Sequence, residues 1–193
     1  MLFKTMEQHE ELRIKIRKFA EEEVKPIAFM LDQENKFPME IINILADMGM
    51  MGIPYSKEYG GAGFDIISYA IAVEELSRVD GGTGVILSAH TSLGSYPISA
   101  FGTETQKQKY LVPLAKGEKL GAFGLTEENA GSDAGGTETT AILEGDYYIL
   151  NGEKIFITNA GKADIYIVFA VTTPDIGIRG ISARSEERRV GKE

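Results

Sequence analysis

The sequence has no cysteine and only two histidines, His9 and His90. Disulfides, thiolate nucleophiles and zinc sites built from cysteine or clustered histidine are therefore excluded, because each needs residues that the chain does not supply. Basic residues are also scarce, since 20 Lys and Arg stand against 29 Asp and Glu and give a formal net charge of -9. This charge excludes nucleic-acid binding through a basic groove. The lack of cysteine is typical of a reducing cytoplasm.

Long apolar segments are missing as well. The longest apolar run, from Ile165 to Val171, is far shorter than the roughly 20 residues of a membrane-spanning helix. The stretch Met1-Leu2-Phe3-Lys4 is charged within a few residues and lacks the apolar core of a secretory signal. We therefore expect no membrane span and no secreted precursor. With 43% hydrophobic and 25% charged residues, the composition is that of a folded globular protein large enough for two domains.

Several common catalytic motifs are also absent. The chain contains no G-x-x-x-x-G-K-[ST], no G-x-S-x-G and no H-E-x-x-H, so phosphate-loop hydrolysis, serine-elbow hydrolysis and zinc proteolysis lack their minimal parts. The stretch Gly60-Gly61-Ala62-Gly63 is not a dinucleotide fingerprint, because its spacing is wrong and no strand precedes it. We expect this stretch to be a connecting loop.

The first part of the chain is predicted to be helical. No glycine precedes Gly49, and all seven methionines lie at or before Met51. Thr5 with Gln8 predicts a capping box for a first helix, which Pro26 should kink or end. One face of this helix carries Leu12, Ile16, Phe19, Ala20, Val24, Ile27, Ala28 and Leu31.

Further helix boundaries follow from capping side chains, prolines and glycines. The predicted helices run from Pro38 to Gly49, from the cap Asp65 to about Arg78, from the cap Thr83 onward, and from the capping box Thr103 with Gln106 through Pro113 to Gly117.

After about Lys119 the spacing of apolar residues changes from the helical repeat to alternation at every second residue. Strands are predicted over residues 120–126, 137–143, 147–150, 155–158 and 164–172. The dipeptide Asn151-Gly152 is a hairpin signal that would lead into the fourth of them. The predicted fold class is therefore α+β, with an N-terminal α-helical domain over residues 1–119 and a partial, truncated middle β domain over residues 120–183.

The last ten residues, 184–193, abandon the β pattern and resemble the in-frame translation of a sequencing-adapter oligonucleotide. We expect this segment to be an artefact rather than native sequence, in which case the true protein continues past Ala183. A genuine charged tail is the alternative. Removal of the segment leaves 16 basic and 26 acidic residues, so the acidic balance remains.

Two strand ends carry hydrogen-bonding groups. In the stretch from Phe123 to Asp133, an apolar strand ends in a threonine and is followed by a loop of small residues. In the stretch from Ile155 to Gly161, a second apolar strand also ends in a threonine, followed by asparagine and glycine. Such ends can hold the polar edge of a heterocycle, while Phe156 could cover one face of its ring. An ordinary polar turn, with Asp133 as a cap, is the alternative for the first loop. His90 lies in an apolar helical stretch, where a histidine packed in the core is the alternative to a ligand-binding one.

At these two motifs the sequence resembles the acyl-CoA dehydrogenase family, especially its short-chain, butyryl-CoA-type members. Three more stretches carry the resemblance: Tyr59-Gly60-Gly61-Ala62-Gly63, Ala72-Val73-Glu74-Glu75-Leu76-Ser77 and Phe101-Gly102-Thr103-Glu104-Thr105-Gln106-Lys107. The resemblance implies an N-terminal helical domain, a middle β domain and a C-terminal helical domain, with FAD between the last two and usually a homotetramer.

The resemblance also implies site residues. Those that would bind FAD are Phe123, Leu125, Thr126, Gly131, Ser132, Phe156, Ile157 and Thr158, with Thr158 near the reactive flavin nitrogen. Ser132 would also contact the CoA side of the substrate, and the floor of the acyl pocket would be shaped by His90, Thr91, Leu93 and Gly94.

Two positions depart from the family pattern. The usual loop T-E-P-G-A-G-S-D has Glu128-Asn129 here in place of proline and glycine, which leaves the rigidity of the loop open. Many relatives carry tryptophan at the position of Phe156, and this chain has none. An aromatic ring face remains at that position, so we expect packing on the flavin to persist.

The activity implied by the resemblance is oxidation of an acyl-CoA to a trans-2-enoyl-CoA, with electrons passed through FAD to an electron-transferring flavoprotein. In the short-chain branch the catalytic glutamate lies in the C-terminal domain, so we assign no catalytic residue here and predict that these residues alone are inactive. Two alternatives stay open: a non-catalytic partner or oligomerisation protein, which a native stop codon after Glu193 would favour, and an acyl-CoA oxidase, which would be rapidly reoxidised by air.

Overall fold

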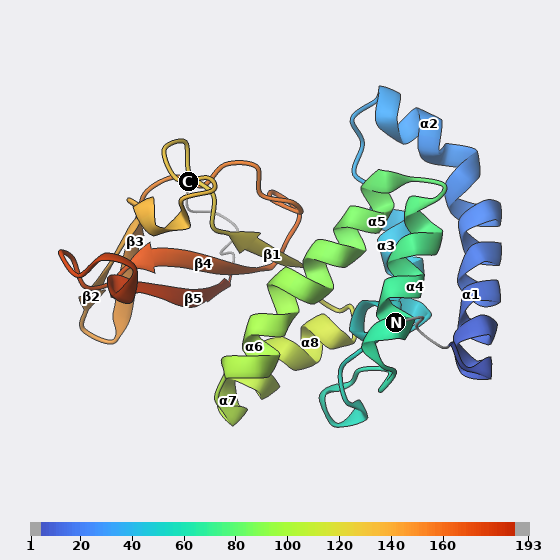
Figure 1. Cartoon of the computed structure of the whole chain (residues 1–193), viewed down its shortest axis with the longest axis horizontal. Helices are drawn as coiled ribbons and strands as arrows, with labels where there is room; N and C mark the ends of the chain where they lie inside the picture. The colour runs from blue at the N-terminus through green and yellow to red at the C-terminus, as the bar shows by residue number, and fades with distance from the viewer. Residues whose placement is uncertain (1–4, 188–193) are drawn as a thin grey trace. The chain divides into compact units, whose positions relative to one another are not determined.

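The computed structural model describes residues 5–187, and the chain divides into two compact units, one up to Lys119 and one from Leu120 (Figure 1). The first unit is helical and the second is built around a β-sheet. This is the α+β organisation expected from the change of apolar period. Within residues 5–187, no helix is long and apolar enough to cross a membrane.

The first unit consists of short α-helices around an aliphatic core. The helices are α1 (Glu7–Phe19), α2 (Lys25–Gln33), α3 (Met39–Asp47), α4 (Ile66–Ser77), α5 (Gly81–Ser88), α6 (Tyr96–Phe101), α7 (Glu104–Gln106) and α8 (Val112–Ala115). Its most deeply buried apolar side chains are Ile16, Leu45, Met51, Ile53, Leu76, Leu87, Leu111 and Leu114. The loop at Gly60 to Gly63 connects a short 3-10 turn to α4, as expected.

A π-helical segment lies just ahead of each of three prolines. The segments are Ala20–Val24 before Pro26, Ala89–Ser95 before Pro97, and Lys107–Leu111 before Pro113. Proline has no N–H to donate and its ring clashes with the carbonyl four residues earlier, so a wider turn ahead of it relieves both problems. Pro26 therefore interrupts the first helix without ending it, because helical structure continues through α2.

Two predicted helix caps are confirmed. Asp65 accepts the backbone N–H of Ser68 at 2.8 Å, and the capping box of Thr103 with Gln106 is present. The helix from Pro38 also agrees, since α3 begins at Met39 and Gly49 follows it with a φ of 74°.

Two other caps lie one to three residues away from the predicted ones. The first helix is capped at Met6, not Thr5, because the buried ring of His9 accepts the Met6 N–H at 3.0 Å. The cap of α5 is Asp80, not Thr83, because its carboxylate accepts the N–H groups of Gly82 and Thr83 at 3.3 and 2.7 Å. Thr83 itself is fully buried inside the helix.

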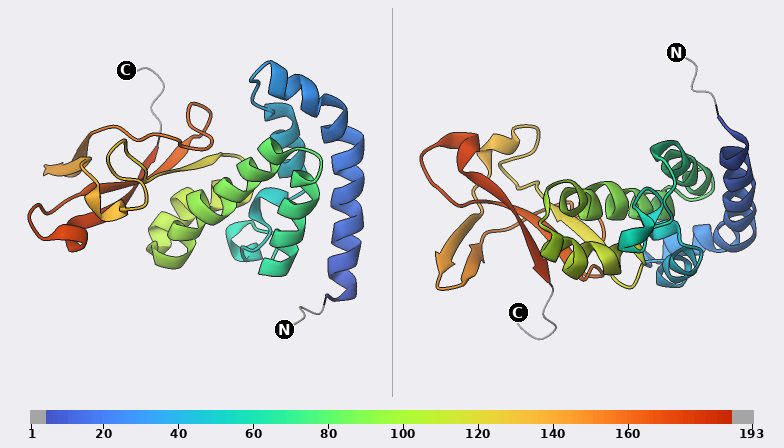
Figure 2. Two further views of the ribbon diagram at one scale, coloured as in Figure 1. Left: turned by 45° about the horizontal axis from the view of Figure 1, so that its top comes forward. Right: turned by 90° about the horizontal axis from the view of Figure 1, so that it is seen from below.

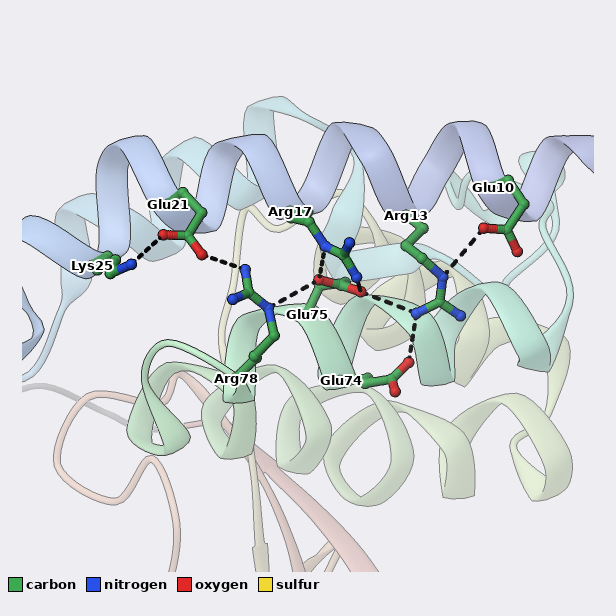
Figure 3. A network of polar contacts seen from close by, with 8 residues as sticks. All are labelled: Glu10, Arg13, Arg17, Glu21, Lys25, Glu74, Glu75 and Arg78. Atoms are coloured by element: carbon green, nitrogen blue, oxygen red, sulfur yellow. Dashed lines mark hydrogen bonds and ion pairs between the residues drawn. The ribbon is translucent and has the colours of Figure 1, made fainter.

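A buried carboxylate joins α1 to α4 (Figure 3). Glu75 is 1% exposed and accepts two hydrogen bonds from Arg17, both at 2.8 Å. Arg13 donates a third at 3.0 Å and Arg78 a longer one at 3.4 Å. The hydrogen bonds from Arg17, with those of the other two arginines, outweigh burial and lower the pKa of Glu75 to about 2.

The second unit contains one five-stranded sheet. Its strands are β1 (Gly121–Gly124), β2 (Thr140–Glu144), β3 (Tyr147–Asn151), β4 (Ile165–Val171) and β5 (Ile181–Glu187). The central strand is β4, which pairs with β5 in antiparallel fashion along its whole length. On its other edge β4 pairs in parallel with β1 and, through Thr140 and Val171, with β2. The β2/β3 hairpin therefore extends away from β4 and β5 (Figure 2).

Four of the five predicted strands are observed with slightly different ends, but residues 155–158 form no strand. The reason lies in the backbone at Gly152 and Phe156. Gly152 packs so closely against Thr139 that no side chain would fit, which ends β3 there, and Phe156 has a φ of 56°. A positive φ is incompatible with an extended strand.

The sheet also continues further than expected. We predicted no strand after residue 172 and an end of the β pattern at Ala183, whereas β5 pairs with β4 from Ile181 to Glu187. Ladder hydrogen bonds are made by the backbone, so a polar sequence at an edge can still pair. The β pattern therefore includes four residues of the atypical segment, and the origin of that segment stays a prediction.

Candidate functional site

The loop after β1 is closed by a tight turn. The N–H of Glu127 donates to the carbonyl of Ala130 at 3.0 Å, and the N–H of Ala130 donates back at 3.2 Å. Glu128 and Asn129 occupy the exposed centre of the turn, and neither has a positive φ. A proline-glycine pair commonly forms a turn with glycine at positive φ, so this turn reaches the same closure with a different backbone geometry.

The second motif lies beside this loop. The N–H of Ile155 donates to the carbonyl of Thr126 at 2.9 Å, and the side-chain amide of Asn159 donates to the carbonyl of Gly121 at 2.9 Å. The structure therefore brings together the two segments that were predicted to converge, although the second is irregular rather than a strand.

A buried ion pair links the two motifs. The Nζ of Lys154 lies 2.5 Å from Oε1 of Glu127 and 3.0 Å from the carbonyl oxygen of Leu125. The carboxylate of Glu127 also accepts the backbone N–H groups of Glu138 at 2.6 Å and Thr139 at 3.1 Å. Burial alone would raise the pKa of Glu127, but the hydrogen bonds from Lys154 and from these amides lower it to about 2.

The hydroxyl and aromatic groups at this site suit a flat heterocycle. Thr126 and Thr158 are half-buried on the two adjoining segments, and their hydroxyls can both donate and accept. Phe156 is 90% exposed and keeps a φ of 56°, so its ring gains little from burial while its backbone is strained. A ring held outward at such a cost can cover the face of a planar ligand. This donor set and ring fit the isoalloxazine of FAD.

The small-residue end of the first loop is open. Gly131 and Ser132 are exposed, and a Cβ added at Gly131 would meet no atom of the described residues within 4 Å. The backbone carbonyl of Asp133 accepts the N–H of Gly136 at 3.1 Å and so begins a short 3-10 turn. Within residues 5–187, the side chain of Asp133 makes no capping hydrogen bond to this turn. Space for a longer ligand therefore exists beside Ser132.

The remaining residues predicted at the FAD site are half-buried. Phe123 packs against Phe169 of β4 with ring centroids 5.1 Å apart, so it belongs partly to the sheet packing. Leu125 and Ile157 flank Thr126 and Thr158 in the sequence and are also half-buried. Their contact with FAD stays a prediction.

The residues predicted to shape an acyl pocket lie in the π-helical segment Ala89–Ser95 of the helical unit. His90 is fully buried, with its Nε2 3.1 Å from the carbonyl oxygen of Leu114, and burial lowers its pKa to about 4. Thr91 and Gly94 are buried too, whereas Leu93 is 41% exposed. His90 is thus a packed core residue, and of these four it is Leu93 that has a side chain accessible to a ligand.

The sequence did not indicate Glu127 and Lys154 as partners. The family resemblance makes Glu127 and Glu128 loop residues at the cofactor rather than a catalytic base, and no motif singles out Lys154. A usable signal is present: Glu127 directly follows the first predicted strand, Lys154 directly precedes the predicted strand 155–158, and the two charges are opposite. Opposite charges beside two converging apolar segments can be buried only as a pair.

Comparison with known proteins gives the family of both units. Residues 6–118 match the N-terminal domain of acyl-CoA dehydrogenases, and residues 122–185 match their middle domain. Among curated proteins, the short-chain specific acyl-CoA dehydrogenase of Clostridium acetobutylicum is 61% identical over 183 residues, which is 95% of this chain and 48% of that protein. The mitochondrial short-chain specific enzyme of Bos taurus is 44% identical over 92% of this chain and 43% of its own length.

Solved structures agree in fold. A chain from a study of the electron transferring flavoprotein of Acidaminococcus fermentans and flavin-based electron bifurcation has a TM-score of 0.94 and 49% identity, covering 97% of this chain and 50% of that one. Butyryl-CoA dehydrogenase from Megasphaera elsdenii has a TM-score of 0.92 and 46% identity, with the same coverage. The chain thus spans about half the length of the relatives it matches.

Proposed function

Because the chain belongs to the acyl-CoA dehydrogenase family, we propose that it forms the helical and sheet part of an FAD-dependent short-chain acyl-CoA dehydrogenase. The reaction is the α,β-dehydrogenation of an acyl-CoA thioester to a trans-2-enoyl-CoA. The identity of 61% to a short-chain specific enzyme supports the short acyl chain.

The observation that carries this proposal is the convergence of the two loops through Ile155 and Thr126. Thr126 and Thr158 would donate hydrogen bonds to the polar edge of the flavin, and Phe156 would cover one face of its ring. Phe123, Leu125, Ile157 and Gly131 would complete the cofactor side, and Ser132 would contact both the cofactor and the CoA portion of the substrate. FAD, when bound, supplies the acceptor for the hydride that leaves the β-carbon.

The helical unit would contribute to the acyl pocket. Leu93 presents an exposed apolar side chain, and buried His90, Thr91 and Gly94 hold its segment in place. We assign no catalytic base among the residues of this chain, because the carboxylate of Glu127 is bound in the ion pair with Lys154 and the family resemblance places both Glu127 and Glu128 in a loop at the cofactor rather than at the substrate carbon.

An electron-transferring flavoprotein would accept the electrons, and the assembled enzyme would be a homotetramer. The likeness to a chain from the Acidaminococcus fermentans electron transferring flavoprotein study supports this choice of acceptor. A cytoplasmic location stays a prediction from the absence of cysteine.

The test uses protein produced from the complete gene. It should purify yellow with FAD and bleach when butyryl-CoA is added without oxygen. A colourless, flavin-free protein would contradict the proposal and favour the non-catalytic alternative. Rapid recovery of the yellow colour in air would instead identify an oxidase.

A pair of variants tests the site itself. Thr158→Val removes one hydroxyl and keeps the side-chain shape, so FAD affinity should fall about tenfold, the effect of one lost hydrogen bond. The matched control Thr173→Val changes an exposed threonine of the same unit and should leave FAD affinity unchanged. Equal affinities for the two variants would exclude Thr158 from the cofactor site.

A further inference from the structure

We propose that Glu127 and Lys154 form a positioning pair that holds the loop 125–130 and the segment 154–159 in one fixed arrangement. The ligand that benefits from this arrangement is FAD, and in that respect the inference rests on the proposed function. The arrangement of the two segments is a property of this chain and can be measured without FAD.

The pair has too many partners in the two segments to be an incidental ion pair. The side chains of Glu127 and Lys154 are 7% and 10% exposed. The Nζ of Lys154 donates to Oε1 of Glu127 and to the carbonyl of Leu125, so one ammonium contacts two residues of the first loop. The carboxylate of Glu127 in turn accepts the two amides just ahead of β2. Three backbone segments therefore meet at a single pair of charges.

Lys154 stands directly ahead of the residues that face the site. Ile155 donates its N–H to Thr126, Phe156 carries the positive φ, and Thr158 supplies the second hydroxyl. An irregular segment has no ladder of hydrogen bonds to define its path, so side-chain contacts must add to the single backbone bond of Ile155 in fixing its ends. Lys154 fixes the start of this segment, and the amide of Asn159 fixes its end on Gly121.

The first loop needs the same support. Its central residues, Glu128 and Asn129, are exposed, and its turn is closed by the reciprocal hydrogen bonds of Glu127 and Ala130. The backbone of Glu127 thus closes the turn, and its side chain binds the turn to Lys154 at the start of the segment 154–159. Loss of the side-chain contact should leave the turn intact and let the two segments separate.

The decisive variant removes both charges at once. Removal of one partner would bury an uncompensated charge and could unfold the unit, whereas removal of both avoids that penalty. In Glu127→Gln with Lys154→Met, the glutamine oxygen can still accept an amide, and methionine fills the volume of the lysine stem. Lys162→Met changes an exposed lysine of the same unit and serves as the control.

The measurement is amide hydrogen exchange of the full chain, resolved by residue. In the double variant we expect the Ile155 amide to exchange about tenfold faster than in the wild type, while amides of β4 keep their protection. Lys154→Arg, which preserves the charge and the donors, should keep slow exchange at Ile155, and Lys162→Met should not change it.

Two results would overturn the inference. Unchanged exchange at Ile155 in the double variant would mean that the pair does not hold the segments together. Equal acceleration at Ile155 and throughout β4 would mean that the pair stabilises the sheet as a whole. Because neither readout involves FAD, failure of this inference is distinguishable from failure of the proposed function, which colourless full-length protein would reveal.

Discussion

A contact between His9 and Asp65 joins the caps of two helices. The Nδ1 of His9 accepts the N–H of Met6 at 3.0 Å, so the proton lies on Nε2, which donates to the Asp65 carboxylate at 2.9 and 3.0 Å. The same carboxylate accepts the N–H of Ser68 at the start of α4. The first turn of α1 and the first turn of α4 are therefore stabilised together.

Replacement of Asp65 by alanine should cost more than the loss of an ordinary cap. An N-cap is worth about 1 kcal/mol, and the buried donor of His9 left without its acceptor adds about 1 to 3 kcal/mol. We expect the unfolding free energy of the helical unit to fall by about 2 to 4 kcal/mol, measured by urea denaturation followed by far-UV circular dichroism. The control is Asp80→Ala, which removes only the cap of α5 and should cost about 1 kcal/mol. Equal losses would show that the His9 contact contributes nothing.

Glu75→Gln should strongly destabilise the helical unit. The buried carboxylate accepts hydrogen bonds from three arginines, and a neutral amide would remove the charge that holds Arg17 and weaken the hold on Arg13 and Arg78, which also pair with Glu74 and Glu21. A loss of about 3 kcal/mol is expected in the same urea measurement. Glu74→Gln is the matched control, because the Glu74 side chain is 65% exposed and its substitution should change stability by less than about 0.5 kcal/mol.

The same residue predicts a pH dependence. The pKa of Glu75 in the folded protein is about 2, below its ordinary value of 4.5, so its contribution is complete above pH 4.5 and is lost as the pH falls toward 2. The stability of Glu75→Gln should therefore decrease less steeply across this range than that of the wild type. Parallel curves would contradict the assignment.

His90 predicts a loss of stability as the solution becomes acidic. Burial lowers its pKa to about 4 from an ordinary 6.5, so the unfolded chain takes up a proton between these values while the folded chain does not. Stability should fall by up to about 3 kcal/mol as the pH decreases from 6.5 to 4. His90→Gln has no titrating ring, and its stability should lack this component. The comparison isolates His90, since both proteins retain His9.

The turn at Glu128 and Asn129 should distinguish two proline substitutions. Glu128 has a negative φ at the first central position, so Glu128→Pro should stabilise the sheet unit by about 0.5 kcal/mol through the unfolded state. Asn129→Pro places proline at the second position, where it disfavours the conformation of the preceding residue, and should destabilise the unit. Urea titration followed by NMR signals of β4 measures both, and a destabilising Glu128→Pro would refute this turn geometry.

The fold was predictable where local signals decide the structure. The α3 boundaries, the Asp65 cap and the Thr103 capping box depend on neighbours a few residues away, and all were predicted. The cap at Met6 depends on a histidine that is buried against Asp65, far along the chain, so a local pattern could not reveal it. Asp80 and Thr83 are both good caps by residue type, and only the burial of Thr83 separates them.

The site was predictable to a smaller extent. The threonine that ends each motif indicated convergence, and the backbone contact between Ile155 and Thr126 agrees. The sequence Ile155-Phe156-Ile157 has the composition of a strand, yet Phe156 takes a positive φ that no residue preference indicates. The ion pair of Glu127 with Lys154 was missed because pairing of charges depends on which segments tertiary structure brings together.

The three π-helical segments bear on how this helical unit tolerates changes of length. A π turn accommodates about one residue more than an α turn, so the helix beyond it is rotated by roughly 100° relative to an uninterrupted α-helix. Deletion of one residue from Ala20–Val24 can therefore be absorbed by a return to ordinary α-helix that keeps the faces of α2 toward their present neighbours, whereas deletion of one residue within α1 would turn those faces away. The prolines after these segments therefore mark the places where the register of a helix, rather than its continuity, is decided.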